Sequence, residues 1–194
     1  MAPVGEVEFA GQLALASARD PLGHGLCAGI VGHADLGRGA AVREVLEAQL
    51  CASAHFRGIR HRSAWHTDET FHQPATYCPP RLLVEDKFRE GFAQLAPLGL
   101  SFDAFLYFTQ LSDLVSLARA FPETSIILNH LGGLIGVGVY AGKRDAVFRE
   151  WKTALLELAK ESNVTIKLGG LGMVTSGFDF HQRERRKREG LGHS

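Results

Sequence analysis

The sequence lacks several features that define whole classes of protein. None of its apolar stretches reaches the roughly 18 residues that a membrane-spanning helix needs, so we expect no membrane protein. Lys and Arg together total 21 and so do Asp and Glu, and this balance argues against a nucleic-acid-binding or membrane-surface protein. The first eight residues carry two acids and no basic region, so we expect no secretory signal peptide.

Cysteine is also scarce. The chain has three cysteines, Cys27, Cys51 and Cys78, which lie far apart and form no C-x-x-C motif. An odd, scattered set favours reduced thiols and a cytoplasmic location over a disulfide scaffold or a zinc knuckle. With 194 residues, 45% of them hydrophobic, the chain is long enough for one domain with a real core. We assign residues 1–181 to this domain and residues 182–194, a basic run without apolar periodicity, to a disordered tail.

Strand-like and helix-like segments alternate along the chain. The segments expected to form strands are residues 26–36, 56–62, 101–108, 125–131 and 164–171. Those in which apolar residues recur at helical spacing are residues 6–19, 40–52, 86–96, 111–121 and 144–160. This alternation predicts an α/β fold with parallel strands. Because a complete eight-stranded barrel needs about 250 residues, two alternatives stay open: an open doubly wound sheet, or a barrel that lacks some of its strands.

Polar residues gather towards the carboxyl ends of the expected strands, where parallel α/β folds place their chemistry. His130 follows the apolar run of residues 125–128 and precedes a glycine-rich turn. Alternation along the other strands places His33 and Lys167 opposite the apolar, helix-facing residues, and Arg60 and Tyr107 lie at two further strand ends. A lysine inside an apolar strand is expected to be buried and therefore to need a partner.

Five segments occur in a familiar order: Cys27-Ala-Gly-Ile-Val-Gly-His-Ala-Asp-Leu36, Phe56-Arg-Gly-Ile-Arg-His61, Leu98-Gly-Leu-Ser-Phe-Asp-Ala-Phe-Leu-Tyr107, Ile127-Leu-Asn-His-Leu-Gly-Gly133 and Lys167-Leu-Gly-Gly-Leu171. With them the chain resembles the amidohydrolase-related family of TIM-barrel hydrolases, in particular the branch of 2-pyrone-4,6-dicarboxylate lactonase and sugar-lactone hydrolases. The resemblance implies a partial (β/α)8 TIM barrel of about five parallel strands, without the family's first two strands and its last.

The resemblance also implies roles for particular residues. His130 matches the histidine at the end of the sixth barrel strand, which binds a metal or polarises the substrate carbonyl, and is the expected catalytic residue. Arg60, Tyr107 and Lys167 match positions on the fourth, fifth and seventh strands, and with His33 they are the expected substrate-binding residues. Such cations and hydroxyls would hold a carboxylate or a developing oxyanion.

The chain also departs from the family's pattern. It contains no His-x-His, and it stops before the eighth-strand aspartate. Relatives often carry a histidine directly after the fifth-strand tyrosine, where this chain has Phe108. Because a catalytic zinc site needs about three protein ligands and His130 is the one ligand nominated, the cofactor stays open between one divalent metal such as zinc and none.

Three functional hypotheses follow. The first is a hydrolase that opens a lactone or another cyclic ester or amide by attack of activated water. The second is a truncated, catalytically inactive remnant whose exposed strand edges lead to oligomerisation. The third is a nucleotide- or phosphate-binding module at the glycine-rich segment 132–138, although its spacing matches neither G-x-G-x-x-G nor the P-loop pattern. We expect a small-molecule substrate and neither nucleic acid nor a membrane as partner.

Overall fold

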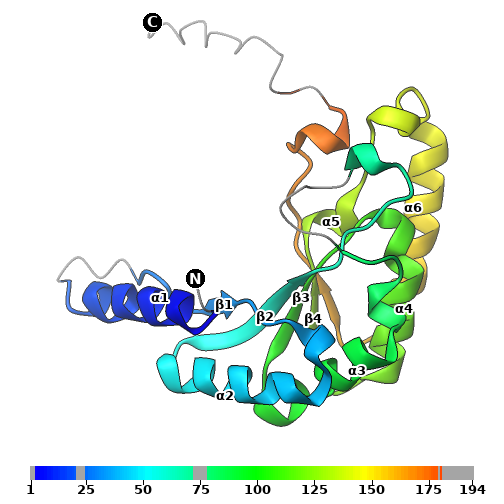
Figure 1. Cartoon of the computed structure of the whole chain (residues 1–194). Coiled ribbons are helices and arrows are strands. Elements are labelled where there is room, and N and C mark those ends of the chain that lie inside the picture. Colours follow the sequence, from blue (N-terminus) through cyan, green and yellow to red (C-terminus); the bar gives the residue numbers. More distant parts are fainter. Residues whose placement is uncertain (1–2, 21–24, 72–77, 179, 181–194) are drawn as a thin grey trace, which may run out of the picture.

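The sheet of the protein is parallel and follows the order of the chain. The computed structural model describes residues 3–20, 25–71, 78–178 and 180. Within these ranges five strands lie in the order β1-β2-β3-β4-β5, and each pairs in parallel with the next (Figure 1). The strands are β1 (Ile30–Gly32), β2 (Phe56–Arg62), β3 (Ser101–Phe105), β4 (Ile126–Leu128) and β5 (Val164–Ile166). A doubly wound sheet changes direction in mid-sheet, so the sequential order excludes it and confirms the partial barrel.

Helices connect the strands and cover one side of the sheet. The α-helices are α1 (Pro3–Ala18), α2 (Arg43–Ala52), α3 (Asp86–Phe92), α4 (Leu111–Ala120), α5 (His130–Gly133) and α6 (Arg144–Leu158). Short 3-10 helices add Leu36–Val42, Glu69–Phe71, Leu82–Val84, Ala96–Leu98, Phe108–Gln110, Gly138–Tyr140 and Val174–Ser176. Figure 1 shows α2, α3, α4 and α6 arrayed along the same side of the sheet. This arrangement is that of a barrel wall, with helices outside and strands inside.

The two faces of the sheet differ in composition because alternate side chains point to opposite sides. The face towards the helices, called the outer face here, carries the fully buried Ile59, Phe102 and Ala104. The opposite, inner face carries Arg60 and Thr165, which are both exposed. The register pairs Arg60 with Asp103 and Asp103 with Ile127, so neighbouring strands present one continuous inner surface.

Four of the five expected strands prove shorter than the sequence predicted. The strand expected over residues 26–36 is reduced to Ile30–Gly32. At its carboxyl side Asp35 accepts the backbone N–H of Gly37 at 3.0 Å and caps a 3-10 helix, so the extended segment cannot continue. Those expected to reach residues 108, 131 and 171 end at 105, 128 and 166. The strand over residues 56–62 is confirmed in full. The predicted site residues His33, Tyr107, His130 and Lys167 lie in the segments that follow the shortened strands.

Two further expectations concern the tail and membrane-spanning segments. The tail over residues 182–194 lies outside the described residues. Within the described part of the chain, no helix combines the length and the apolar character that a membrane crossing requires.

Candidate functional site

An ion pair spans the inner face at the carboxyl side of the sheet. Lys167, just past β5, donates from its ammonium group to the carboxylate of Asp103 on β3. The side chain of Asp103 is only 5% exposed, whereas that of Lys167 is 52% exposed. Lys167 is therefore not the buried lysine that the sequence predicted, but the prediction that it needs a partner is confirmed. The lysine neutralises a carboxylate that would otherwise be buried without a counter-charge.

Three further polar side chains on the same face contact one aromatic ring, that of Phe105. The guanidinium carbons of Arg60 and Arg62 lie 4.8 and 5.0 Å from the centroid of the Phe105 ring. The imidazole of His130 meets the same ring edge-on, with centroids 5.6 Å apart and an interplanar angle of 85°. A cation over a ring face contributes about 0.5–1 kcal/mol at an exposed site. Phe105 thus organises two cations and the histidine into one cluster.

His130 reaches this cluster through an unusual backbone conformation. By simple alternation from the outer-face residue Leu128, its side chain would point to the helices. Instead His130 and Leu131 adopt the left-handed conformation, with φ of 53° and 55°, and two glycines with positive φ follow. Non-glycine residues rarely adopt this conformation. The short helix α5 is therefore a left-handed turn, and the turn brings the ring of His130 to the inner face.

The electrostatic environment of His130 favours its neutral form. Partial burial lowers the pKa of the imidazole, and the charges of Arg60 and Lys167 lower it further. Because the ordinary histidine pKa of about 6.5 is already below neutrality, a lowered pKa makes the neutral form of the ring predominate at pH 7. A neutral imidazole carries one N–H donor and one acceptor nitrogen.

The remaining predicted site residues lie at the margin of the cluster. His33 follows β1 and contacts the backbone carbonyl of Arg60 through its Nδ1 atom at 3.0 Å. Tyr107 lies past the end of β3, buried, and its hydroxyl donates to the carbonyl of Phe71 at 2.9 Å. The structure thus brings Arg60, His130 and Lys167 together and places His33 beside Arg60. It directs the hydroxyl of Tyr107 to the end of the 3-10 helix Glu69–Phe71.

Comparison with known proteins identifies the family. The sequence profile described as Amidohydrolase matches residues 9–190. The chain belongs to the amidohydrolase family.

The chain is also similar to individual proteins and solved structures. The chain is 38% identical over 151 residues to the uncharacterized protein y4mH of Sinorhizobium fredii, covering 77% of this chain and 46% of that protein. A crystal structure of an amidohydrolase from Burkholderia multivorans with bound zinc aligns with a TM-score of 0.66 at 24% identity, over 94% of this chain and 54% of that one. A second crystal structure from that organism, with bound HEPES, aligns with a TM-score of 0.63 at 22% identity, over 90% and 53%. The amidohydrolase chain spans about half the length of these relatives.

The residues described in this amidohydrolase chain do not fit a metal centre. They contain no group of three or more His, Cys, Asp or Glu side chains arranged to hold a metal ion. The charges that act on His130 are the cations Arg60 and Lys167, which would repel a divalent ion. Asp103, the carboxylate on the same face of the sheet, is already paired with Lys167. His130 therefore lies among groups suited to an anion.

Three residues of the inner face at this site were not predicted as site residues from the sequence: Arg62, Asp103 and Phe105. No role follows from the sequence for Asp103 or Phe105, which alternate with the buried Phe102 and Ala104 on β3. The signal that could have found Asp103 is an acid in the middle of the apolar strand Ser101–Phe105, because such a buried acid requires a cation. Arg62 shares the parity of Arg60 on β2 and points to the same ring. His61, between these two arginines, faces the other way, and its ring packs against that of Phe88.

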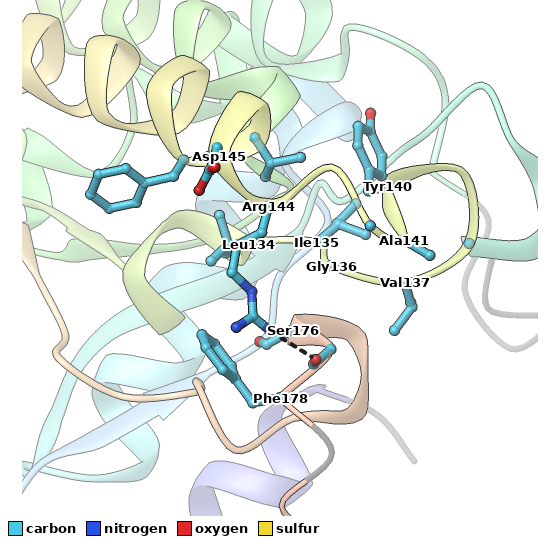
Figure 2. Close-up of a pocket in the computed structure, with 15 residues that line it drawn as sticks. Leu134, Ile135, Gly136, Val137, Tyr140, Ala141, Arg144, Asp145, Ser176 and Phe178 are labelled. Atoms are coloured by element: carbon cyan, nitrogen blue, oxygen red, sulfur yellow. Dashed lines mark hydrogen bonds between the residues drawn. The ribbon is translucent and has the colours of Figure 1, made fainter.

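A separate cavity lies beyond the glycine-rich turn. It has a volume of about 590 Å³ between residues 134–142, the first turn of α6 and residues 176–178 (Figure 2). Arg144 crosses it, donating to the carbonyl of Gly177 at 3.3 Å with its guanidinium carbon 4.8 Å from the centroid of the Phe178 ring. Among the described residues that line this cavity, none belongs to the cluster around Phe105.

The glycines in and after this turn have a packing role. A Cβ at Gly133 would lie 1.9 Å from the carbonyl oxygen of Leu106, and one at Gly136 would lie 2.4 Å from that of Ser176. Both positions require glycine because another segment of backbone passes directly beside them. The close approaches account for glycine here without a phosphate ligand.

Proposed function

We propose that this chain supplies one wall of a hydrolase active site that opens a lactone, or another cyclic ester or amide, carrying a carboxylate. Its membership in the amidohydrolase family supports a hydrolase-type reaction. The observation that carries the more specific proposal is the convergence of His130, Arg60 and Arg62 on one aromatic ring of the inner face. Two fixed cations beside a neutral imidazole suit an anionic substrate with a polarised carbonyl.

Each group has a distinct task in the proposed reaction. Arg60 and Arg62 bind the carboxylate of the substrate, and this contact places the ring carbonyl next to His130. Water adds to the carbonyl carbon while the N–H of neutral His130 donates to the carbonyl oxygen, on which negative charge develops. The ring C–O or C–N bond then breaks, and the proton lost by the attacking water passes to the departing ring oxygen or nitrogen, which leaves a hydroxy acid or an amino acid. Lys167, held by Asp103, adds positive charge to the same surface. His33 is proposed to border the site through Arg60, and Tyr107 to support the 3-10 helix that ends at Phe71.

None of the roles proposed for these residues requires zinc. A relative from Burkholderia multivorans was crystallised with zinc, but the described residues of this chain do not form a ligand set for it. Of the two roles expected for His130, metal ligand and carbonyl polariser, the surroundings of the ring support the second.

The structure also supports a second candidate, a barrel fragment without activity of its own. In the described part of the chain, β1 and β5 each have a strand partner on one side only. Unpaired strand edges favour association with another chain. This candidate predicts oligomers and no hydrolysis.

Hydrolysis of a panel of lactones, with and without a carboxylate substituent, tests the proposal. The wild type is expected to hydrolyse carboxylated lactones, and His130→Ala is expected to lose at least about 100-fold in kcat, the usual loss when one oxyanion donor is removed. His55→Ala is the matched control, because His55 precedes β2 at the amino side of the sheet. Equal rates for wild type and His130→Ala would refute the role of His130. No turnover by a wild type that forms oligomers would favour the fragment.

A further inference from the structure

The left-handed turn that presents His130 is a strained backbone conformation that needs support from outside the turn. His130 and Leu131 both have side chains, and both lie at φ values that such residues rarely adopt. A conformation of this kind persists only when the surrounding structure fixes it, and it occurs preferentially at functional sites. The groups that fix the turn therefore decide where the imidazole of His130 points.

Hydrogen bonds hold Leu131 from two other parts of the chain. Its N–H donates to the carbonyl of Lys167 at 3.2 Å, which ties the turn to the segment after β5. Its carbonyl accepts the indole N–H of Trp151, on α6, at 2.7 Å. Trp151 is half-buried, so this bond is partly shielded from water. Both backbone polar groups of the strained residue are thus satisfied by groups outside the turn.

Gly170 lies directly behind the side chain of His130. A Cβ at Gly170 would lie 2.5 Å from Cβ of His130 and 3.0 Å from its Nδ1. Real Cβ atoms do not approach other atoms that closely, so either His130 or the segment of Gly170 would have to move. The absence of a side chain at Gly170 is therefore what allows His130 to lie against Phe105.

We propose that Trp151 and Gly170 are positioning residues: Trp151 locks the left-handed turn through the carbonyl of Leu131, and Gly170 leaves the space that the side chain of His130 occupies. The inference rests on the proposed function of His130 for its effect on catalysis. The orientation of the ring can be measured without any substrate.

Nuclear magnetic resonance of the His130 ring is the direct test for Trp151. Because the imidazole lies edge-on to Phe105 at 5.6 Å, the ring current of Phe105 shifts the His130 Cε1–H signal, which the spectrum of His130→Ala assigns. Trp151→Phe removes the N–H donor and keeps an aromatic ring. It is expected to move this signal towards its value in an unstructured peptide, and to lower kcat at least about tenfold with KM within about twofold.

Phe148→Leu is the matched control for Trp151→Phe. Phe148 lies on the same helix, is half-exposed and contacts the ring of Trp151 at 5.5 Å between centroids. Its replacement disturbs the same surface of α6 without removing the hydrogen bond to Leu131. The His130 signal and kcat are therefore expected to stay at their wild-type values.

Gly170→Ala is the second test, and the chain offers two controls. Gly169→Ala adds the same methyl group one residue earlier, where a Cβ meets nothing within 4 Å. Gly99→Ala adds it at a position with φ of 65°, similar to the 83° of Gly170, again with nothing within 4 Å. Gly169→Ala shows whether a methyl group in this segment displaces the signal without a contact to His130. Gly99→Ala shows the effect of a side chain at a positive φ where that side chain contacts nothing. Only Gly170→Ala is expected to displace the His130 signal.

The outcomes distinguish this inference from the proposed function. Wild-type His130 signals and wild-type rates in a folded Trp151→Phe variant would overturn the inference, whether or not Gly170→Ala folds. A displaced His130 signal in Trp151→Phe supports it even if the wild type hydrolyses no lactone, in which case only the proposed function fails. A fall in kcat with an unmoved His130 signal would show that Trp151 acts by another route and would also overturn it.

Discussion

The two faces of the sheet carry different kinds of residue although they alternate along the same strands. On the outer face, Phe102 is fully buried between the rings of Phe88 and Phe92 of α3. One residue later, Asp103 points to the inner face and pairs with Lys167. The outer face therefore stabilises the fold by excluding water, whereas the inner face collects charges that must satisfy one another. A substitution should have different consequences depending on which face it touches.

The largest difference is expected between an apolar residue of the outer face and a polar residue of the inner face. Phe102→Ala should reduce the free energy of unfolding by about 3–5 kcal/mol, because it removes a buried aromatic ring and leaves a cavity. Thr165→Ala, on the exposed inner face of β5, should change it by less than about 0.5 kcal/mol. Chemical denaturation of both variants measures the contrast. Losses of similar size would show that the inner face is also packed.

A smaller effect is expected from the ion pair of the inner face. Lys167→Met should lower the free energy of unfolding by about 2 to 3 kcal/mol, because the buried carboxylate of Asp103 loses its cation. The exposure of Lys167 keeps the loss below that of a fully buried pair. The double variant Asp103→Asn/Lys167→Met should recover most of it, since the charge itself is gone. Denaturation of the single and double variants decides, and equal stability of the two would contradict the assignment.

The smallest expected effect concerns a histidine of the outer face and depends on pH. Burial, the largest influence, lowers the pKa of His61 from 6.5 to about 4, and Nδ1 of His61 accepts the N–H of Leu36 at 3.2 Å. Since the folded-state pKa is depressed, the unfolded chain binds the proton more readily, and stability falls as pH drops from 6.5 towards 4. Between pH 7 and pH 5 this group should cost about 2 kcal/mol.

The variant His61→Asn tests this pH dependence. Asparagine can still accept the Leu36 N–H but does not titrate. Denaturation at pH 7 and pH 5 should show a loss of stability in the wild type that exceeds the loss in the variant by about 2 kcal/mol. The same pH dependence in both proteins would show that His61 is not the group responsible.

Much of the fold could be predicted because it depends on patterns that are local in the sequence. The strand over residues 56–62 was found in full from its composition, and α6 was predicted to within two residues of its observed end at Leu158. Alternation correctly assigned Lys167 to the inner face, opposite the apolar residues of its segment. The strand ends were missed because Asp35 and the turn at His130 depend on hydrogen bonds and backbone angles that periodicity does not encode.

The sequence by itself determined the α/β alternation, the parallel strands and the identity of the polar residues at the strand ends, because side-chain periodicity and turn residues are properties of short segments. Only the tertiary structure decided which of those residues meet. The pairing of Asp103 with Lys167 joins residues 64 positions apart, and the position of His130 depends on a left-handed turn that contradicts simple alternation. That turn is fixed by Trp151 from α6 and by the absence of a side chain at Gly170, and these are long-range contacts that no local pattern specifies.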